Sequence, residues 1–345
     1  MYDVIIVGMG PGGATLARLL NKKYKVAIID KKNNKITKCC GGLLAPDAQK
    51  SLASFDICLP KDVVVDPQIF SVRTIDFDND LERFYQRFYI NMNRSMFDNY
   101  LASIIGDNVE MFNDSLCSEI IKWDSHYELT IKTKKETITL KTRILIGADG
   151  ADSIVRKHIY PNKKIKQYVA IQEWYKEDNK NSFYSCIFDS KITDSYCWTI
   201  SKDKHFIIGG AFPKENCNEK FNLLKDKVKK QGIEFKKMES REGCLVNIYT
   251  LGSLGIGNKN AYLIGEAAGM ISPSSLEGIS YAIDSARILS NVLNKDLDKV
   301  TFRYFVKSLR IRFKLFTKLL KKPFMYNKIF RYFVMKSNLT ALKKA

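Results

Sequence analysis

The sequence has 345 residues, 45% of them hydrophobic, and a formal net charge of +19. This length suits two interlocked domains better than one minimal core. The eight cysteines include no Cys-x-x-Cys pair and only three histidines accompany them, which argues against a disulfide framework or a metal site and favours a reducing cytoplasm. The longest uncharged stretch, residues 243–258, is too short and too rich in glycine to cross a bilayer.

Residues 3–30 predict a nucleotide-binding β-α-β unit. DVIIVG is typical of a buried strand, ATLARLL continues at helical spacing, and KVAIID is a second strand that ends in an acid. The intervening G-x-G-x-x-G motif allows a tight turn, close approach to a pyrophosphate and packing of the helix on the strand. The helix N-terminus faces the phosphates, and the acid is placed to accept from ribose hydroxyls. We expect the following residues to bind the dinucleotide: Gly8, Gly10, Pro11, Gly12, Gly13, Asp30 and Lys31.

The same order of strand, glycine and helix occurs twice more. RILIGADGADSIVRKHIY (143–160) places Asp149 and Gly150 after a strand, and YLIGEAAGMISPSSLEGISYAIDSARIL (262–289) places Gly265 and Glu266 there. An NAD-dependent dehydrogenase would complete its nucleotide domain in one stretch, whereas three dispersed turns suit the longer FAD. The helix beginning at Gly278 and Ile279 would direct its positive dipole end at the pyrimidine edge of the flavin.

With these motifs the chain resembles the flavoprotein superfamily of aromatic hydroxylases and geranylgeranyl reductases. KCCGGLLAPDAQ (38–49), INMNRSMFDNYL (90–101), YCWTISKDKHFIIGGAFP (196–213) and SSLEGISYA resemble the geranylgeranyl reductase branch, and most closely its CbrA group, over roughly residues 1–320. The resemblance implies an α/β (α+β) fold like that of p-hydroxybenzoate hydroxylase. It would have a Rossmann-like FAD-binding domain, an inserted antiparallel β-sheet substrate domain and C-terminal helices.

The resemblance also implies further cofactor contacts. Cys40 and Gly41, with Gly42 beside them, would lie near the isoalloxazine, and Arg94 of an R-x-x-F-D motif would contact the cofactor. Glu266 stands where the branch usually has Asp, and it keeps a carboxylate able to accept from a ribitol hydroxyl.

Three residues are the catalytic candidates that the resemblance implies: Cys40, Tyr196 and Trp198. Tyr196 and Trp198 match a Tyr-x-Trp-x-Phe-Pro motif that lines a lipid pocket, although Ile200 and Ser201 replace its last two residues. Each candidate would serve as proton donor or would line the pocket. A packed thiol or a packed ring is the alternative for each.

Alternating polar and apolar runs between the nucleotide motifs predict antiparallel strands. We expect a discontinuous FAD-binding domain made of residues 1–61, 90–162 and 258–295. Residues 62–89 and 163–257 would form the antiparallel-sheet substrate domain, and residues 296–345 a basic, amphipathic, helical C-terminal region.

The C-terminal region is strongly basic: residues 301–345 contain thirteen Lys or Arg and no Asp or Glu. Apolar residues recur there at spacings of three and four, at Phe302, Phe305, Leu309, Phe313, Phe316 and Leu320, with Lys or Arg at 303, 307, 310, 314, 318 and 321. This pattern predicts an amphipathic helix that Pro323 interrupts. Two interpretations remain open, packing of the apolar face on the nucleotide domain or contact with an anionic membrane surface. The absence of a recognition motif argues against nucleic acid.

The sequence therefore predicts a cytoplasmic FAD-dependent oxidoreductase of geranylgeranyl reductase type, peripheral to the inner face of the membrane if the basic region binds lipid. Reduced flavin would transfer hydride to a hydrophobic acceptor, such as an isoprenoid lipid. An FAD-dependent monooxygenase and a flavin-binding regulatory protein with a membrane-interacting tail are the alternatives. The electron donor would be NAD(P)H or a small, acidic redox protein.

Overall fold

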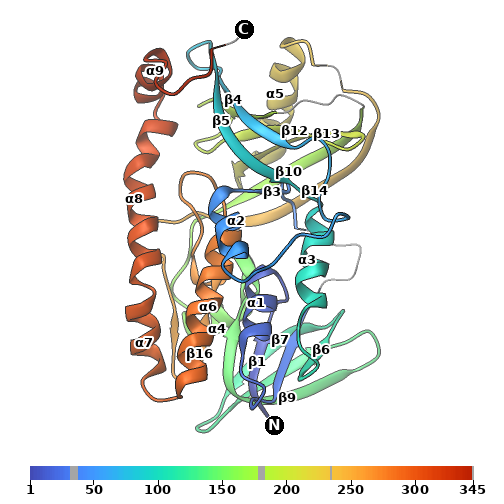
Figure 1. The fold of residues 1–345 in the computed structure, drawn as a ribbon, viewed down its shortest axis with the longest axis vertical. Helices are drawn as coiled ribbons and strands as arrows, with labels where there is room; N and C mark the ends of the chain where they lie inside the picture. The colour runs from blue at the N-terminus through green and yellow to red at the C-terminus, as the bar shows by residue number, and fades with distance from the viewer. Residues whose placement is uncertain (32–37, 178–182, 234, 344–345) are drawn as a thin grey trace.

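The computed structural model describes residues 1–31, 38–177, 183–233 and 235–343 and contains two eight-stranded sheets (Figure 1). The first sheet has the order β15-β16-β9-β1-β2-β6, and β8 and β7 extend it from β9. Its strands are β1 (Tyr2–Val7), β2 (Val26–Ile29), β6 (Val109–Phe112), β7 (Leu116–Lys122), β8 (Tyr127–Lys132), β9 (Thr137–Gly147), β15 (Gly257–Asn258) and β16 (Ala261–Leu263).

The central strands of this first sheet, from β16 through β9, β1 and β2 to β6, are parallel. β2 is buried along its whole length and β1 almost so, because helices cover the sheet. α1 (Pro11–Leu19) packs against α6 (Ile279–Lys295). The two helices approach closely at Gly12, where an added Cβ would lie only 3.4 Å from Ala282.

The second sheet has the order β14-β10-β13-β12-β11-β4-β5-β3. Its strands are β3 (Leu43–Leu44), β4 (Ile69–Asp76), β5 (Leu81–Asn91), β10 (Gln167–Lys176), β11 (Phe183–Phe188), β12 (Cys197–Lys202), β13 (His205–Pro213) and β14 (Met238–Asn247). The amphipathic helix α5 (Cys217–Lys230) covers part of this sheet through Phe221, Leu224 and Val228.

Two details of the second sheet differ from the sequence prediction. β4 and β11 pair in parallel, in an otherwise antiparallel sheet. The chain leaves this sheet after β5 and returns only at β10, so no hairpin constrains the direction of β11 beside β4. β3 comes from the segment predicted for the FAD-binding domain, but it pairs with β5.

Shorter helices connect and flank the sheets. They are α2 (Pro46–Ala53), α3 (Arg94–Ser103), α4 (Ile154–Ile159) and the 3₁₀ turns η1 (Gly150–Asp152) and η2 (Gly265–Ala268). Within the described residues, no helix combines the length and apolar character needed to span a bilayer.

The C-terminal region forms α7 (Val300–Lys307), α8 (Leu309–Tyr326) and α9 (Lys328–Lys336), which run along one side of the molecule (Figure 1). The prediction that Pro323 interrupts the helix is wrong, because α8 continues through Pro323 to Tyr326. Pro323 costs one backbone hydrogen bond near the helix end, and Asn327 N donates to Pro323 O at 3.0 Å.

Candidate functional site

The glycine turn between β1 and α1 has a separate steric reason for each glycine. Gly8 has φ +100°, and a Cβ there would lie 2.5 Å from Ala148 O. A Cβ on Gly13 would lie 1.9 Å from Gly8 O, so both positions require glycine for the fold itself. At Gly10, by contrast, an added Cβ would have no described atom within 4 Å. The N-terminus of α1, where Pro11, Gly12 and Gly13 begin the helix, therefore opens onto free space among the described residues.

The acid predicted to bind ribose lies at the carboxyl end of the first sheet. Asp30 follows β2 directly and is 8% exposed, and its backbone N–H donates to Phe112 O of the neighbouring β6 at 2.9 Å. Lys31, which is next in the chain, is exposed. The structure thus holds the Asp30 backbone against β6 and leaves Lys31 at the surface.

The Asp149 carboxylate caps a helix. It accepts from Ser153 Oγ at 2.5 Å and from Ile154 N at 2.8 Å, at the start of α4. Burial raises the pKa of Asp149, and these hydrogen bonds oppose the rise. Gly150 has φ +74°, and the described atom nearest its added Cβ is Glu266 Oε2 at 4.0 Å. Gly150 is therefore the residue of this motif that presents backbone to open space within the described part of the chain.

Gly265 and Glu266 are buried in η2. Gly265 has φ +55° and donates its N–H to Ser285 Oγ of α6 at 2.9 Å. Glu266 Oε1 accepts from Asn247 N at 2.9 Å, and Oε2 accepts from Lys38 Nζ. The predicted ribitol-binding carboxylate therefore already has an ammonium partner.

Gly278 is the N-cap residue of α6, and Ile279 begins that helix. The preceding Leu276 has φ +51°, a conformation that a Leu side chain rarely adopts and that tends to occur at functional loops. The loop is fixed from outside by two tyrosines: Tyr196 donates to Ser275 O at 2.7 Å and Tyr326 to Ser274 O at 2.8 Å.

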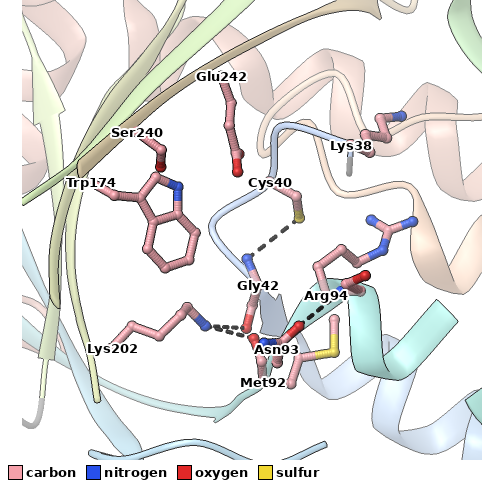
Figure 2. Close-up of a pocket in the computed structure, with 11 residues that line it drawn as sticks. Lys38, Cys40, Gly42, Met92, Asn93, Arg94, Trp174, Lys202, Ser240 and Glu242 are labelled. Atoms are coloured by element: carbon pink, nitrogen blue, oxygen red, sulfur yellow. Dashed lines mark hydrogen bonds between the residues drawn. The ribbon is translucent and has the colours of Figure 1, made fainter. Parts of the chain in front are cut away.

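A cavity of about 270 Å³ lies between the second sheet, the loop before β3 and the start of α3 (Figure 2). Three of the predicted residues line it, Cys40, Gly42 and Arg94. The other lining residues are Lys38, Met92, Asn93, Ser95, Trp174, Lys202, Ser240 and Glu242. The cavity thus gathers the loop before β3, the start of α3 and strands β10, β12 and β14.

Cys40 and Arg94 meet at the edge of this cavity. Cys40 Sγ accepts from Gly42 N at 3.4 Å, and Arg94 Nε donates to Asp98 Oδ1 at 2.9 Å. Burial opposes the charge on Arg94, but the nearby Asp98 and Cys40 raise its pKa above the usual value. Arg94 is therefore a permanent cation that lies beside the Cys40 thiol.

Two of the predicted catalytic residues do not line the cavity. Tyr196 and Trp198 lie beyond Gly41, with ring centroids 5.8 Å apart. An added Cβ at Gly41 would lie 2.5 Å from Ile200 Cδ1 and 4.0 Å from Trp198 Nε1. Burial raises the pKa of Tyr196 well above its usual value, and its hydroxyl donates to Ser275 O, so Tyr196 is poorly placed to act as an acid.

Sequence reasoning missed Lys202, the last residue of β12. Its side chain is 3% exposed, and Nζ donates to Asn91 Oδ1 at 2.6 Å. Nζ also donates to Met92 O at 2.6 Å and Gly42 O at 3.3 Å (Figure 2). Burial lowers the pKa of Lys202 to about 7. The ammonium thus faces only uncharged oxygens in these bonds and is able to release a proton near neutral pH.

One of two buried indole groups, that of Trp174, lines the cavity and points to a ligand that hydrogen bonds there. Trp174 Nε1 and Trp198 Nε1 are buried, and neither has a hydrogen-bond partner among the described residues. Buried donors are normally satisfied, so unpaired ones call for an explanation. No group of three or more His, Cys, Asp or Glu side chains suited to a metal ion occurs in the described part of the chain.

Comparison of the sequence with curated proteins gives nearly full-length relatives. The chain is 45% identical over 343 residues to Protein CbrA of Escherichia coli O139:H28 (strain E24377A / ETEC), covering 98% of this chain and 97% of that protein. It is 46% identical over 341 residues to Protein CbrA of Shigella sonnei (strain Ss046), covering 97% and 96%. The chain belongs to the CbrA family. No protein-family model matches it.

Solved structures show which fold this CbrA family member has. A geranylgeranyl bacteriochlorophyll reductase-like protein from Thermoplasma acidophilum superposes with a TM-score of 0.75 at 21% identity, over 99% of this chain and 88% of that one. The p-nitrophenol 4-monooxygenase PnpA from Pseudomonas putida DLL-E4 gives a TM-score of 0.75 at 15% identity, over 98% and 93%. A variant of the flavin-dependent brominase Bmp2 gives 0.73 at 15% identity, over 98% and 100%. The predicted fold, shared by flavoprotein reductases and monooxygenases, is therefore confirmed.

Proposed function

We propose that this CbrA family member binds FAD and reduces a carbon–carbon double bond in a hydrophobic acceptor of isoprenoid type. The observation that carries the proposal is the cavity between the second sheet and α3 whose lining includes both the Cys40 thiol and the buried Lys202 ammonium. Saturation of a double bond needs a hydride and a proton, and this cavity offers two proton donors.

The described residues fit FAD. Among the described residues the N-terminus of α1 opens onto free space at Gly10, where a pyrophosphate would accept from backbone N–H groups. Asp30 would hold a ribose, and the backbone of Gly150, Gly265 and Glu266 would hold the central part of the cofactor. The Trp174 indole, which has no partner among the described residues, is a donor that a ligand in the cavity would satisfy. Bound FAD, once reduced, would supply the hydride.

The protein's own contribution would be to orient the acceptor and deliver the proton. With a pKa lowered to about 7, Lys202 has an acidity suited to proton transfer at neutral pH. Arg94 lies beside Cys40 as a fixed cation, and we assign delivery of the proton to Lys202. The hydride and the proton would add to the two alkene carbons, and NAD(P)H or a small, acidic redox protein would reduce the flavin again.

An apolar groove supports the hydrophobic character of the acceptor. A second cavity of about 340 Å³ is lined mainly by aliphatic side chains, including Leu52, Ile57, Leu59, Val64 and Ile90. Ile90 is two residues before Met92, which lines the first cavity. We assign this groove to the chain of the acceptor.

A monooxygenase is the second candidate, because PnpA superposes as well as the reductase-like protein does. The fold alone does not decide between the two reactions. Only the fate of the reducing equivalents separates them.

The test is anaerobic reduction of the purified flavoprotein, followed by addition of polyprenyl lipid or, separately, of oxygen. Reoxidation by lipid, with a product two mass units heavier per double bond reduced, would support the reductase. Hydroxylated product that forms only with oxygen would establish the monooxygenase. Reoxidation by neither acceptor would favour a regulatory flavoprotein and would contradict the proposal.

A further inference from the structure

The outward face of the C-terminal helices carries a continuous apolar stripe. The stripe consists of the six residues predicted from the sequence pattern, and all are exposed: Phe302 67%, Phe305 43%, Leu309 47%, Phe313 69%, Phe316 40% and Leu320 58%. α7 and α8 follow one another almost without a break, since Ser308 between them keeps a helical conformation. From Phe302 to Leu320 the stripe therefore extends over roughly 27 Å.

A different set of residues attaches these helices to the body. Tyr304, Ser308, Ile311 and Leu315 are buried, and Tyr304 Oη donates to Leu263 O at 2.9 Å. At about 100° per residue they fall on the side of the helix opposite the stripe. The interpretation that the stripe packs on the nucleotide domain is therefore wrong, because another face of the same helices does so.

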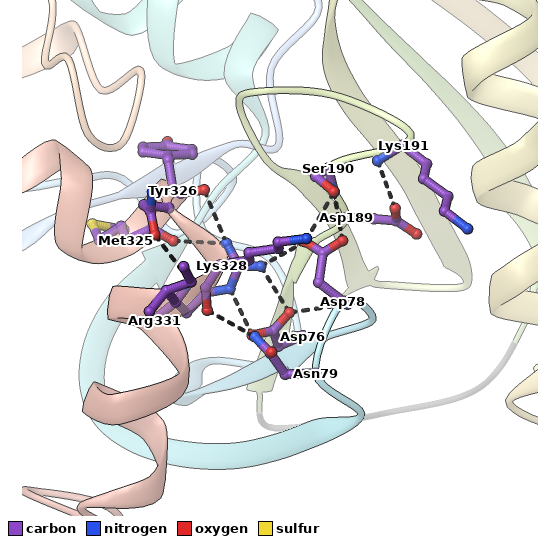
Figure 3. Close-up of polar contacts among 12 residues, drawn as sticks. Asp76, Asp78, Asn79, Asp189, Ser190, Lys191, Met325, Tyr326, Lys328 and Arg331 are labelled. Atoms are coloured by element: carbon purple, nitrogen blue, oxygen red, sulfur yellow. Dashed lines mark hydrogen bonds and ion pairs between the residues drawn. The ribbon is translucent and has the colours of Figure 1, made fainter.

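Contacts at the far end keep the helices firmly in place. Arg331 of α9 is 4% exposed, and its guanidinium binds Asp76 at 2.7 and 2.8 Å and Asp78 at 2.7 Å (Figure 3). Lys314 and Lys318 of α8 pair with Asp47 at 2.9 and 3.2 Å. The stripe is thus presented by a fixed support, and its exposure does not come from a detached tail.

Charge indicates what covers the stripe. Lys307, Arg310 and Lys321 are exposed on α7 and α8 and form no ion pair with a described residue. Residues 301–345 contain thirteen Lys or Arg and no acid. A second copy of the chain would bring the same excess of positive charge against it, whereas an anionic lipid surface would neutralise it.

We propose that the outward face of α7 and α8 docks on an anionic lipid bilayer, with its aromatic side chains inserted at the boundary between headgroups and acyl chains. The chemistry of an interfacial helix, aromatic residues in the apolar stripe with Lys and Arg beside it, matches this face. α8 ends beside the proposed site, since Tyr326 contacts Ser274 and Tyr196 contacts the adjacent Ser275. Docking itself does not depend on the proposed reaction.

The first experiment measures sedimentation of the full-length protein with vesicles of pure phosphatidylcholine and of phosphatidylcholine with 30% phosphatidylglycerol. We expect binding to the anionic vesicles that weakens as salt increases. The triple variant Lys307→Gln, Arg310→Gln, Lys321→Gln should bind about tenfold more weakly or worse. A matched control, Lys22→Gln, Lys61→Gln, Lys132→Gln, removes three exposed lysines elsewhere and should retain binding.

The second experiment removes apolar surface. The variant Phe302→Ser, Phe313→Ser, Leu320→Ser should lose vesicle binding. The control Phe70→Ser, Phe88→Ser, Leu251→Ser removes three side chains that are also more than half exposed and should keep it. A single Phe313→Trp change should give fluorescence that brominated phospholipid quenches, and Phe70→Trp should not. Melting temperatures report whether each variant is folded, and Phe313→Trp tests the contact without removing apolar surface.

Three results would overturn the proposal. The first is absence of binding to anionic vesicles. The second is equal loss of binding in the matched controls. The third is a dimer in solution that the apolar variant dissociates while vesicle binding stays unchanged, which would assign the stripe to an interface between two copies. Vesicle binding needs no turnover, so failure here is distinguishable from failure of the proposed reduction.

Discussion

Lys38 and Glu266 form an ion pair although 228 positions separate them in the sequence. The pair joins the loop before β3 to η2, and Glu266 Oε1 also accepts from Asn247 N of β14 at 2.9 Å. One carboxylate thus connects the loop at the cavity, the second sheet and the turn predicted to bind the cofactor. Removal of the Glu266 carboxylate should therefore weaken flavin binding by more than the loss of a single contact would.

We expect Glu266→Ala to weaken FAD binding by roughly ten- to a hundredfold, since a hydrogen bond to a charged group is lost and a buried N–H is left unpaired. Flavin fluorescence titration of the apoprotein measures this. Glu266→Gln keeps an acceptor for Asn247 and should be milder, and the exposed Glu136→Ala is the control for loss of a carboxylate. Unchanged flavin affinity in Glu266→Ala would refute the assignment.

Two glycines of the first turn should respond in opposite ways to alanine. Gly13→Ala places Cβ 1.9 Å from Gly8 O and should destabilise the fold by about 1–3 kcal/mol or more. Gly10→Ala meets no described atom within 4 Å and should leave the melting temperature of the apoprotein unchanged. It should nevertheless weaken FAD binding about tenfold or more, because the methyl group occupies the approach to the pyrophosphate. If Gly10→Ala binds FAD normally, the open space at α1 is not the phosphate site.

This contrast shows why part of the site was predictable. The strand, the glycines, the helix and Asp30 all lie within about thirty residues of each other. The local sequence pattern therefore predicts the turn without knowledge of the rest of the fold. The cavity is different, because the packing of the second sheet brings its walls together from segments far apart in the sequence. Pattern alone contains no information on that packing.

Lys202 is the clearest example of what the sequence conceals. Its neighbours Ser201, Asp203, Lys204 and His205 read as a polar hairpin, in which a lysine is normally solvated. Only the structure shows that all six residues of β12 are buried. The signal that could have found it is a lysine at the end of a predicted strand, and that signal is common at hairpins with no buried lysine.

If Lys202 delivers the proton, the rate of flavin reoxidation by the acceptor should fall as pH rises through about 7, since the protonated form is the active one. Lys202→Met should reduce this rate by about a hundredfold or more and remove that limb of the pH profile. Stopped-flow absorbance, recorded at intervals of about half a pH unit across roughly pH 5.5–9, measures both the reoxidation rate and its pH profile. The exposed Lys204→Met on the same hairpin should behave as wild type.

Lys202→Arg separates a proton donor from a structural cation. Arginine retains charge and donors for the surrounding carbonyl oxygens but does not deprotonate in this range. We therefore expect a folded variant that remains slow. Full recovery of rate by Lys202→Arg, with an unchanged pH profile, would assign Lys202 to positioning of the Gly42 and Met92 backbone and not to catalysis.

Arg331 should dominate attachment of α9, because it is buried against two carboxylates, Asp76 and Asp78 (Figure 3). Arg331→Met leaves these carboxylates without their cation and should lower the free energy of unfolding by about 3–5 kcal/mol. Lys134→Met breaks an exposed pair with Asp114 and should cost less than about 1 kcal/mol in urea denaturation.

Burial alone would raise the pKa of Asp78, but hydrogen bonds from Ser190 and the charge of Arg331 hold it below the usual value. This contribution to stability is therefore present above pH 4 or so and declines as pH falls through the lowered pKa. The decline should be smaller in Arg331→Met; an equal acid sensitivity in both proteins would show that the cluster does not fasten α9.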